Sequence, residues 1–322
     1  MKVLVADKFE QIGLDGLKAL GCEVINQPTA GANLGGALAE ADPQILVVRS
    51  TKVPAAVMER AKNLKVIIRA GAGTDNIETP AATARKIAVC NTPGMNAVAV
   101  AELAMGLLIC CDRRIPDQCD SLKQGQWDKK TFSKSRGLKG TTLGVIGVGH
   151  IGQEVVKRAV AFGMHVIAWS RGITPQHAAA LNCEFGGETT PELLALAKKC
   201  DAISVHLPAE ASTNKLFNKT FFDALKPGAY FINTSRGSLV DEPALIEAVK
   251  TKGIRAGLDV YDKQPGEPQA KFESEVAKLP GVYTTHHCGA STDQAQNAVA
   301  LEVVRMVKVY KESGKIENSV NG

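Results

Sequence analysis

Short apolar runs rich in β-branched residues alternate with longer segments of helical period along almost the whole chain. Uninterrupted apolar runs are typical of strands buried on both faces of a parallel sheet, and apolar residues spaced three or four apart are typical of connecting helices. The alternation therefore predicts an α/β protein with parallel sheets. The expected strands lie at residues 2–6, 45–49, 66–69, 143–146, 166–169, 202–206, 230–233, 255–258 and 282–285.

The distribution of these strands predicts two domains. The strands from residue 143 onward, with their helical crossovers, fit one doubly wound sheet of the Rossmann type. About the first 95 residues are then left to form a smaller α/β domain with its own core. Long apolar helices are expected at residues 96–113 and 292–311.

Composition and charge narrow the class of protein. The 322 residues are 45% hydrophobic and 22% charged with a net charge of +5, which are ordinary globular values and too mild to indicate a nucleic acid partner. The longest apolar run contains Glu102 and is too short to cross a membrane, and Asp7 comes too early for a secretory signal. The eight cysteines form no C-x-x-C pair, so we expect reduced thiols, a cytoplasmic protein and no metal site.

A glycine motif follows the strand at 143–146. Its spacing is Gly147-x-Gly149-x-x-Gly152, and a segment of helical period and a second strand come next. In a dinucleotide-binding turn the first glycine makes the turn, the second lets the backbone approach a pyrophosphate, and the third lets the helix pack closely on the sheet. The motif alone is a weak signal, but its position between a strand and a helix favours a nucleotide site.

Three candidate functional residues each lie just past the end of a predicted strand: Arg236, Asp259 and His287. Ligands of doubly wound sheets bind beyond the carboxyl ends of the strands, so these side chains are expected to share an edge with the glycine loop. Taken singly, the arginine could be solvated, the histidine merely hydrogen-bonded, and the aspartate a turn cap. Their coincidence at one edge favours a catalytic site.

These side chains suit hydride transfer between a nicotinamide and a 2-oxo acid. The fork of Arg236 can hold the substrate carboxylate with two hydrogen bonds. The imidazole of His287 titrates near neutrality and can act as acid or base in either direction. Asp259 is placed where it could hydrogen-bond the cofactor.

Several segments together resemble the D-isomer-specific 2-hydroxyacid dehydrogenases over almost the whole length. They are RAGAGTDNI, NTPGMNAVAVAELAMGLL, the glycine motif, FINTSRGSLVDEPAL and GLDVYDKQP. The resemblance implies a discontinuous, flavodoxin-like substrate domain, residues 1–96 and 291–322, and a dinucleotide-binding domain, residues 97–290. It also implies a cleft between the domains and a homodimer formed largely by the dinucleotide-binding domain.

The resemblance also implies roles for individual residues. Arg236 would bind the substrate, His287 would be the acid or base, and Gln264 stands at the position of the residue that contacts this histidine. The residues expected at the cofactor are Gly147, Gly149, His150, Ile151, Gly152, Ser170, Arg171, Leu207, Thr234, Ser235, Asp259 and Gly289. Those expected at the substrate are Arg49, Arg69, Ala70, Gly71 and Asn96.

Gln264 is a departure from the family pattern, which has a glutamate there. A glutamate would hydrogen-bond the histidine and favour its imidazolium form, whereas a glutamine can orient the ring but cannot stabilise its charge. We therefore expect a weaker proton donor and an acid-shifted pH profile. Asp262 or Glu267 could supply the charge instead. The formate dehydrogenase branch also carries glutamine there, but other segments of this chain argue against that branch.

A second departure lies at the end of the second strand of the Rossmann unit. An NAD site expects an acidic residue there, accepting from the ribose 2′-hydroxyl, and this chain has Ser170 followed by Arg171. Without a carboxylate a 2′-phosphate meets no repulsion, and Arg171 offers it a partner. The cofactor is therefore NAD or NADP, with NADP slightly favoured, unless Arg171 simply points into solvent.

Two further segments, LKQGQWDKKTF and HHCGASTDQAQN, are most similar to the D-3-phosphoglycerate dehydrogenase branch. The substrate that this implies is D-3-phosphoglycerate, oxidised to 3-phosphohydroxypyruvate on the way to serine, and Arg49, Arg69 and the basic run 129–139 could bind its anionic groups. The alternatives are a glyoxylate or hydroxypyruvate reductase of the same family and a non-catalytic NAD(H)-sensing corepressor. A nucleic-acid-binding role would rest on this basic run alone, which matches no known nucleic-acid-binding motif.

Overall fold

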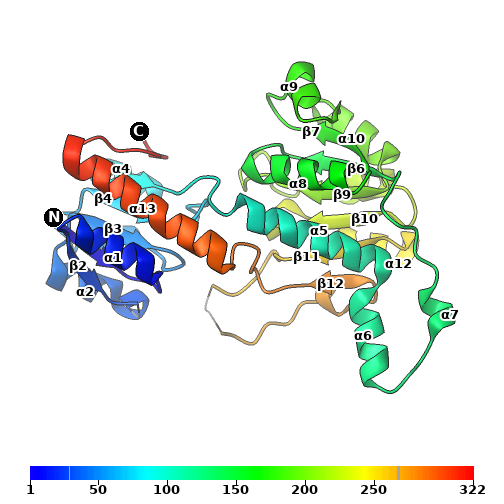
Figure 1. Ribbon diagram of the computed structural model, residues 1–322, viewed down its shortest axis with the longest axis horizontal. Coiled ribbons are helices and arrows are strands. Elements are labelled where there is room, and N and C mark those ends of the chain that lie inside the picture. The colour runs from blue at the N-terminus through cyan, green and yellow to red at the C-terminus, as the bar shows by residue number, and fades with distance from the viewer. Residues whose placement is uncertain (29, 267–268) are drawn as a thin grey trace. The chain divides into compact units, whose positions relative to one another are not determined.

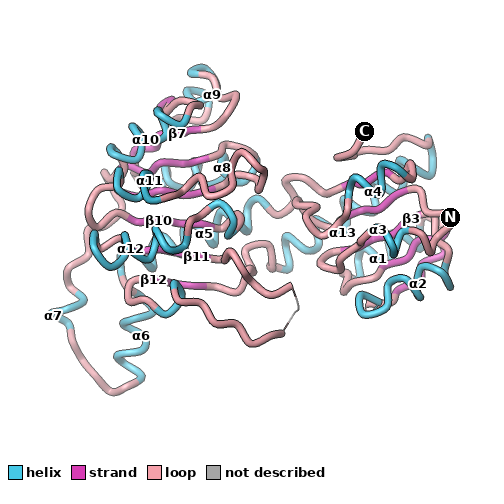
Figure 2. The backbone as a smooth tube through the Cα atoms, turned by 180° about the vertical axis from the view of Figure 1, so that it is seen from behind, coloured by secondary structure: helices cyan, strands magenta, loops and turns pink. Residues whose placement is uncertain are grey.

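The chain folds into two units, each built around its own parallel sheet. The computed structural model describes residues 1–28, 30–266 and 269–322. One unit joins Met1–Asn96 to Ala290–Gly322, and the other is the continuous segment Ala97–Gly289. Helices flank the sheet in each unit (Figures 1 and 2), so the prediction of an α/β fold with a Rossmann unit and a second α/β domain is confirmed.

The first unit has a five-stranded sheet in the flavodoxin-like order β2-β1-β3-β4-β5. Its strands are β1 (Lys2–Val5), β2 (Glu23–Asn26), β3 (Ile45–Val48), β4 (Val66–Arg69) and β5 (Ala88–Cys90). Its helices are α1 (Gln11–Ala19), the 3-10 turn η1 (Ala30–Asn33), α2 (Leu34–Ala41), α3 (Ala55–Met58), α4 (Thr79–Ala84) and the C-terminal α13 (Asp293–Ser313). Because α13 packs against α1, the C-terminal residues complete the unit that the N-terminal residues begin.

Alternation along the strands divides the core of this unit into two layers. Val3 and Val5 belong to the cluster that α1 and α13 cover, whereas Leu4 and Ala6 belong to the cluster that α2 and α3 cover. The sequence analysis did not identify β2 and β5. Strand β2 lies at an edge of the sheet and is only partly buried, and β5 has three residues, so neither shows a long apolar run.

The second unit has a seven-stranded sheet in the order β12-β11-β10-β9-β6-β7-β8. The strands are β6 (Thr142–Ile146), β7 (His165–Trp169), β8 (Glu184–Phe185), β9 (Ala202–Val205), β10 (Tyr230–Asn233), β11 (Arg255–Leu258) and β12 (Val282–Thr284). The helices are α5 (Ala97–Arg113), α6 (Ile115–Lys123), α7 (Lys129–Phe132), α8 (His150–Ala161), α9 (Pro175–Ala180), α10 (Thr190–Lys199), α11 (Lys219–Ala224) and α12 (Glu242–Lys252), with 3-10 turns η2 (Gly237–Leu239) and η3 (Val276–Lys278).

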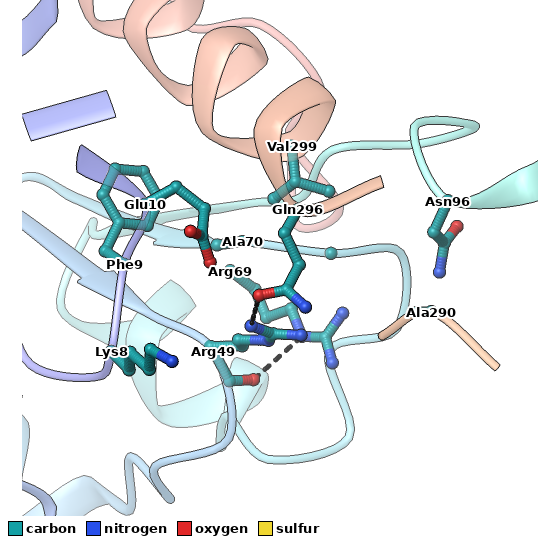
Figure 3. A pocket seen from close by; sticks show the side chains of 11 residues that line it. Lys8, Phe9, Glu10, Arg49, Arg69, Ala70, Asn96, Ala290, Gln296 and Val299 are labelled. Atoms are coloured by element: carbon teal, nitrogen blue, oxygen red, sulfur yellow. Dashed lines mark hydrogen bonds between the residues drawn. The ribbon is translucent and has the colours of Figure 1, made fainter. Parts of the chain in front are cut away.

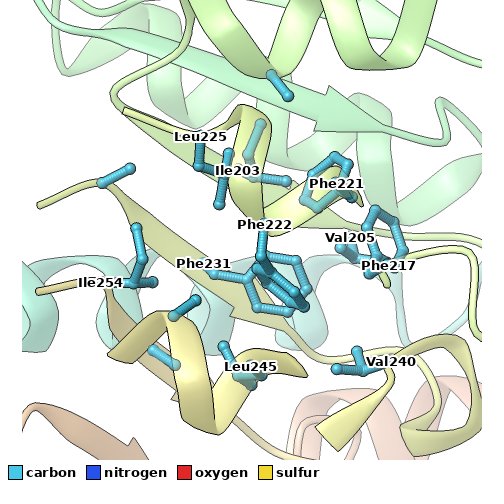
Figure 4. Close-up of a cluster of buried hydrophobic side chains, with 14 of the residues drawn as sticks. Ile203, Val205, Phe217, Phe221, Phe222, Leu225, Phe231, Val240, Leu245 and Ile254 are labelled. Carbon is cyan, nitrogen blue, oxygen red and sulfur yellow. The ribbon is translucent and has the colours of Figure 1, made fainter. Parts of the chain in front are cut away.

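The strand order of the second unit reverses between β6 and β9, which is the arrangement that opens a ligand-binding crevice in doubly wound sheets. Helices α5 and α8 cover one face of this sheet, and α10, α11 and α12 cover the other. The core layer between the sheet and α10, α11 and α12 contains an aromatic cluster in which Phe217, Phe221 and Phe222 surround Phe231 of β10 (Figure 4). Strand β8, missed from sequence, has two exposed residues.

Helices α6 and α7 lie outside these layers and extend away from the sheet of the second unit (Figure 1). Within the described residues, every helix is too short or too polar to span a bilayer.

Candidate functional site

The glycine motif forms the turn between β6 and α8. Gly147 has a φ of 95°, and a Cβ there would lie 2.4 Å from the carbonyl oxygen of His206. A Cβ on Gly152 would lie 1.9 Å from the carbonyl oxygen of Gly147, so the helix can approach the turn only without a side chain. A Cβ on Gly149 would meet nothing within 4 Å, which leaves open space beside the backbone where a phosphate is expected.

Helix α8 begins directly after Gly149 with no side-chain cap and no acidic residue in its first turn. The first backbone N–H groups of a helix have no partners within it, and the helix dipole adds a partial positive charge there. The start of α8 is therefore suited to an anion such as a pyrophosphate. His150 and Ile151, which the resemblance places at the cofactor, form this first turn.

Two buried polar atoms near the ends of β9 and β10 have no hydrogen-bond partner within the described residues: Nδ1 of His206 and Oγ1 of Thr234. The other ring nitrogen of His206 pairs with Oγ of Ser204 at 2.8 Å, and burial lowers the pKa of His206 to about 3, so the ring is neutral. A buried polar group without a partner costs free energy that a bound ligand can recover. The pair therefore fits a polar ligand, such as a dinucleotide, at this edge of the sheet.

The sequence analysis assigned Thr234 to the cofactor site but overlooked His206, although the position of His206 at the end of a predicted strand was a usable signal. Its neighbour Leu207 is buried beside Gly147. The hydroxyl of Ser235 donates to the carbonyl oxygen of Val205 at 2.8 Å. That hydroxyl therefore joins the ends of β9 and β10.

The loop after β12, which carries His287, is held by Asp259. This buried carboxylate accepts hydrogen bonds from Oγ1 of Thr285 at 2.6 Å and from the backbone N–H groups of Cys288 and Gly289, both at 2.9 Å. His287 lies between these donors with a φ of 52°, a left-handed conformation that is uncommon for a histidine. Asp259 thus has the turn-capping role, and its predicted contact with the cofactor stays a prediction.

The ring of His287 contacts Gln264. Nε2 of Gln264 lies 2.5 Å from Nδ1 of His287, and Oε1 of Gln264 accepts from the backbone N–H of Tyr261 at 3.2 Å. Because Oε1 has its own donor, the amide presents its N–H to Nδ1, which then accepts and leaves the proton of a neutral ring on Nε2. Asp262 uses its backbone N–H to bond Glu242, and Glu267 lies outside the described residues.

Arg236 lies on the loop after β10, beside the loop after β11. A Cβ on Gly237 would be 1.9 Å from the carbonyl carbon of Tyr261, so the two loops are in direct backbone contact. Nη1 of Arg236 donates to the carbonyl oxygen of Ser235 at 2.8 Å. Since Tyr261 also bonds the amide that holds His287, the three loops form one connected group at the carboxyl edge of β10, β11 and β12.

A separate pocket in the first unit brings together all the predicted substrate residues (Figure 3). Nη1 of Arg49 donates to Oε1 of Gln296 at 3.0 Å, and Nε of Arg69 donates to the carbonyl oxygen of Arg49 at 3.1 Å. Gly71 has a φ of 146°, and a Cβ there would lie 1.7 Å from Nη1 of Arg69. The complete lining is Lys8, Phe9, Glu10, Arg49, Arg69, Ala70, Gly71, Asn96, Ala290, Gln296 and Val299.

Two arginines and a lysine make this pocket suitable for an anionic group, with Glu10 as an opposing charge. The sequence analysis did not identify Lys8, Glu10 or Gln296, because their positions carry no motif of their own. Within the described residues, no three histidine, cysteine, aspartate or glutamate side chains gather as a metal site would require.

At the end of β7 the structure shows partners that the sequence analysis did not identify. Ser170 and Arg171 replace the expected acid, but carboxylates reach this loop from elsewhere. Nη2 of Arg171 lies 3.4 Å from Oε2 of Glu210, and Nη1 donates to Oγ of Ser212 at 3.0 Å. Oε2 of Glu188 accepts from the backbone N–H of Gly172 at 3.1 Å. Carboxylates therefore lie at this loop although none stands at the strand end, and Arg171 has polar partners; the preference between NAD and NADP stays a prediction.

One residue of the basic run 129–139, Arg136, packs against the sheet of the second unit. The guanidinium of Arg136 lies over the ring of Tyr230, 5.3 Å from its centroid, and 3.7 Å from a carboxylate oxygen of Asp201. Lys129 and Lys130 lie on α7, outside the sheet layers.

Comparisons with known proteins agree with this geometry. The profile described as "D-isomer specific 2-hydroxyacid dehydrogenase, NAD binding domain" matches residues 105–289. The chain is 39% identical over 323 residues to a D-3-phosphoglycerate dehydrogenase of Methanocaldococcus jannaschii, an alignment that covers 100% of this chain but only 59% of that protein. It is 45% identical over 272 residues to a hydroxypyruvate reductase of Thermotoga maritima, which covers 84% of this chain and 85% of that one.

A similar solved structure is an NADPH-dependent glyoxylate/hydroxypyruvate reductase of Sinorhizobium meliloti in complex with NADP and malonate. The two superpose with a TM-score of 0.82 at 29% identity, covering 99% of this chain and 96% of that one. The matched profile spans the glycine turn and the loops that carry Arg236 and His287, and the second relative aligns over most of both lengths. This chain therefore belongs to the D-isomer-specific 2-hydroxyacid dehydrogenase family.

Proposed function

We propose that this protein is an NAD(P)-dependent dehydrogenase that oxidises D-3-phosphoglycerate to 3-phosphohydroxypyruvate. The observation that carries the proposal is the connected group of loops after β10, β11 and β12, which hold Arg236, Gln264 and His287 at the same sheet edge as the glycine turn. The name of the M. jannaschii relative supports the choice of substrate. The first unit would bind an anionic group of the substrate, and the second would bind the cofactor and supply Arg236 and His287.

The chemistry divides between the cofactor and the chain. When bound, the nicotinamide accepts or returns the hydride of the substrate C2–H bond. Arg236 would hold the carboxylate with its guanidinium fork. His287 would exchange the proton of the substrate 2-oxygen at Nε2, the ring nitrogen that Gln264 does not contact. In reduction Nε2–H donates that proton; in oxidation Nε2 accepts it with the ring proton on Nδ1, which requires the Gln264 amide to turn its Oε1 toward Nδ1. Asp259 would act indirectly by keeping the loop of His287 in place.

The pocket of Arg49 and Arg69 would bind an anionic group of the substrate. Gln296 accepts from Arg49, and the carbonyl oxygen of Arg49 accepts from Arg69, so both guanidinium groups are pre-oriented. Pre-oriented cations lose less side-chain entropy when an anion binds. A phosphorylated substrate is therefore expected to be preferred over its unphosphorylated analogue.

For the cofactor we propose that both NAD and NADP bind, with Arg171 giving NADP a modest advantage. The guanidinium lies at the end of β7, the second strand of the Rossmann unit, where the ribose 2′-group is expected. The Arg171 side chain is 50% exposed and remains accessible to a phosphate, although it also pairs with Glu210.

We also propose a homodimer formed through α6 and α7. Trp127 is 81% exposed and Leu122 is 57% exposed on this extension, and Phe132 lines the same surface pocket. Large exposed apolar side chains that gather in this way mark interaction surfaces. Sedimentation velocity should show a dimer that Trp127→Lys weakens, and a monomer at every concentration would contradict the proposal.

The direct test is a set of initial rates with purified protein. D-3-Phosphoglycerate is offered with NAD and with NADP, and glyoxylate and hydroxypyruvate are offered with the reduced cofactors. The proposal requires D-3-phosphoglycerate turnover that Arg236→Gln abolishes, with kcat/KM for 3-phosphohydroxypyruvate above that for either unphosphorylated acid. Reduction of hydroxypyruvate in preference to its phosphorylated form would favour the second candidate, a hydroxypyruvate reductase, which the T. maritima relative supports. Dinucleotide binding without any turnover would instead indicate a non-catalytic sensor.

A further inference from the structure

The charge around the end of β7 is set by residues from three separate segments. Arg171 belongs to the turn after β7, Glu188 to the segment after β8, and Glu210 to the loop after β9. Glu210 contacts the guanidinium of Arg171, and Glu188 accepts from the backbone of the same turn. The guanidinium of Arg171 therefore faces the carboxylate of Glu210, and a second carboxylate, that of Glu188, lies at the same turn although no acid stands at the strand end itself.

Glu210 is held at this place by the fold of its own loop. The hydroxyl of the buried Thr213 shares its proton between the carbonyl oxygens of Pro208, at 2.8 Å, and Glu210, at 3.1 Å. It also accepts a hydrogen bond from the backbone N–H of Glu210 at 2.9 Å. The hydroxyl of Ser212 connects Arg171, at 3.0 Å, with the carboxylate of Glu210, at 3.4 Å. The carboxylate of Glu210 therefore lies beside the guanidinium of Arg171, on a loop that these hydrogen bonds stabilise.

We propose that Glu210 is a cofactor-discriminating residue that takes the place of the acid missing from the end of β7. It acts against the 2′-phosphate of NADP, both by its own charge and by engaging Arg171, and it can accept a hydrogen bond from the 2′-hydroxyl of NAD. The inference rests on the proposed function, because it assigns the adenosine ribose to this strand end. It makes the Arg171–Glu210 pair, rather than Arg171 alone, the determinant of cofactor choice.

The expected size of the effect follows from the charges. A 2′-phosphate carries about two negative charges at neutral pH. Both members of the pair are about half exposed, with 50% and 52% of each side chain accessible, so water and salt screen much of the repulsion. Neutralising Glu210 should therefore raise the ratio of NADP to NAD affinity by about five- to tenfold at low salt, and by less at high salt.

The test compares Glu210→Gln with the parent, because this change removes the charge and keeps the shape of an exposed side chain. Dissociation constants for NADPH and NADH are measured by fluorescence titration, and those for adenosine 2′,5′-bisphosphate and AMP by calorimetry, so that the readout does not depend on turnover. Glu247→Gln is the matched control: Glu247 is 51% exposed on α12 of the same unit and pairs with Lys219 at 2.8 Å.

The proposal expects a higher NADPH to NADH affinity ratio in Glu210→Gln and an unchanged ratio in Glu247→Gln. In an Arg171→Ala background, a persisting effect of Glu210→Gln would identify direct repulsion, and a lost effect would identify competition for Arg171; either supports the assignment. Equal ratios in the parent and Glu210→Gln, with both dinucleotides binding, would overturn it and leave the dehydrogenase proposal standing. Failure of the parent to bind any dinucleotide would instead refute the proposed function.

Discussion

Replacing Gln264 by glutamate should move the pH dependence of carbonyl reduction to higher pH. In the parent, the amide donates to Nδ1 of His287 at 2.5 Å, which favours a neutral ring. A carboxylate at this place would accept from Nδ1–H instead and would stabilise the imidazolium, the form that donates a proton to the substrate. The direction of the shift is therefore upward, because the donor form survives to higher pH in the variant.

The magnitude can be worked from the same contact. A charge-assisted hydrogen bond between exposed partners contributes about 1 to 2 kcal/mol, and one pH unit corresponds to about 1.4 kcal/mol. His287 is exposed and Gln264 partly so, which places the pair at the lower end of that range. The midpoint of the descending limb of kcat/KM should consequently rise by about 0.7 pH unit.

The assay follows reduction of 3-phosphohydroxypyruvate from about pH 5 to about pH 9, the range in which histidines titrate. Gln269→Glu is the control, since Gln269 lines the same pocket as Gln264 and His287 and its substitution adds the same charge nearby. The control should shift the midpoint much less. Superimposable curves for Gln264→Glu and the parent would refute the reasoning.

Other changes test the remaining geometry. Gly152→Ala puts a Cβ 1.9 Å from the carbonyl oxygen of Gly147, so we expect a loss of about 1 to 3 kcal/mol in unfolding free energy and weaker NADH binding, measured by thermal melting and titration; unaltered binding would contradict it. Gly71→Ala should displace Arg69 and raise KM for the phosphorylated substrate at least tenfold with less effect on kcat; an equal fall in both constants would argue against a binding role. Asp259→Ala leaves two backbone N–H groups of the following loop without their acceptor and should lower kcat by about a hundredfold while dinucleotide affinity changes little. A kcat for Asp259→Ala equal to that of the parent would show that the loop of His287 does not need the hydrogen bonds to Asp259.

Much of the fold and the candidate site could be predicted because both follow from position along parallel strands. Arg236, Asp259 and His287 each follow a mostly buried strand, and strand ends in such sheets meet at one edge, so their common placement needed no knowledge of distances. The short edge strands β2, β5 and β8 were not predicted because partial burial or a length of two or three residues removes the apolar run.

The partners of the predicted side chains could not be found in the same way. Glu210 and Arg171 are 39 residues apart and meet only because β7 and β9 flank β6 in the sheet. Gln296 meets Arg49 across 247 residues because α13 returns to the first unit. Such pairs depend on the tertiary path of the chain, which no local pattern encodes. The end of β7 was consequently predictable from the sequence, whereas the carboxylates that reach it from other segments were not.

The return of α13 to the first unit has a consequence for the order in which the two units can fold. The second unit is one uninterrupted segment, so all of its residues leave the ribosome before α13 does. The first unit is split around it, because the layer under α1 contains Val303, Met306 and Val307, which are translated after the whole of the second unit. The strands of the first unit, although synthesised before the second unit, must therefore wait with one apolar face only partly covered until α13 emerges.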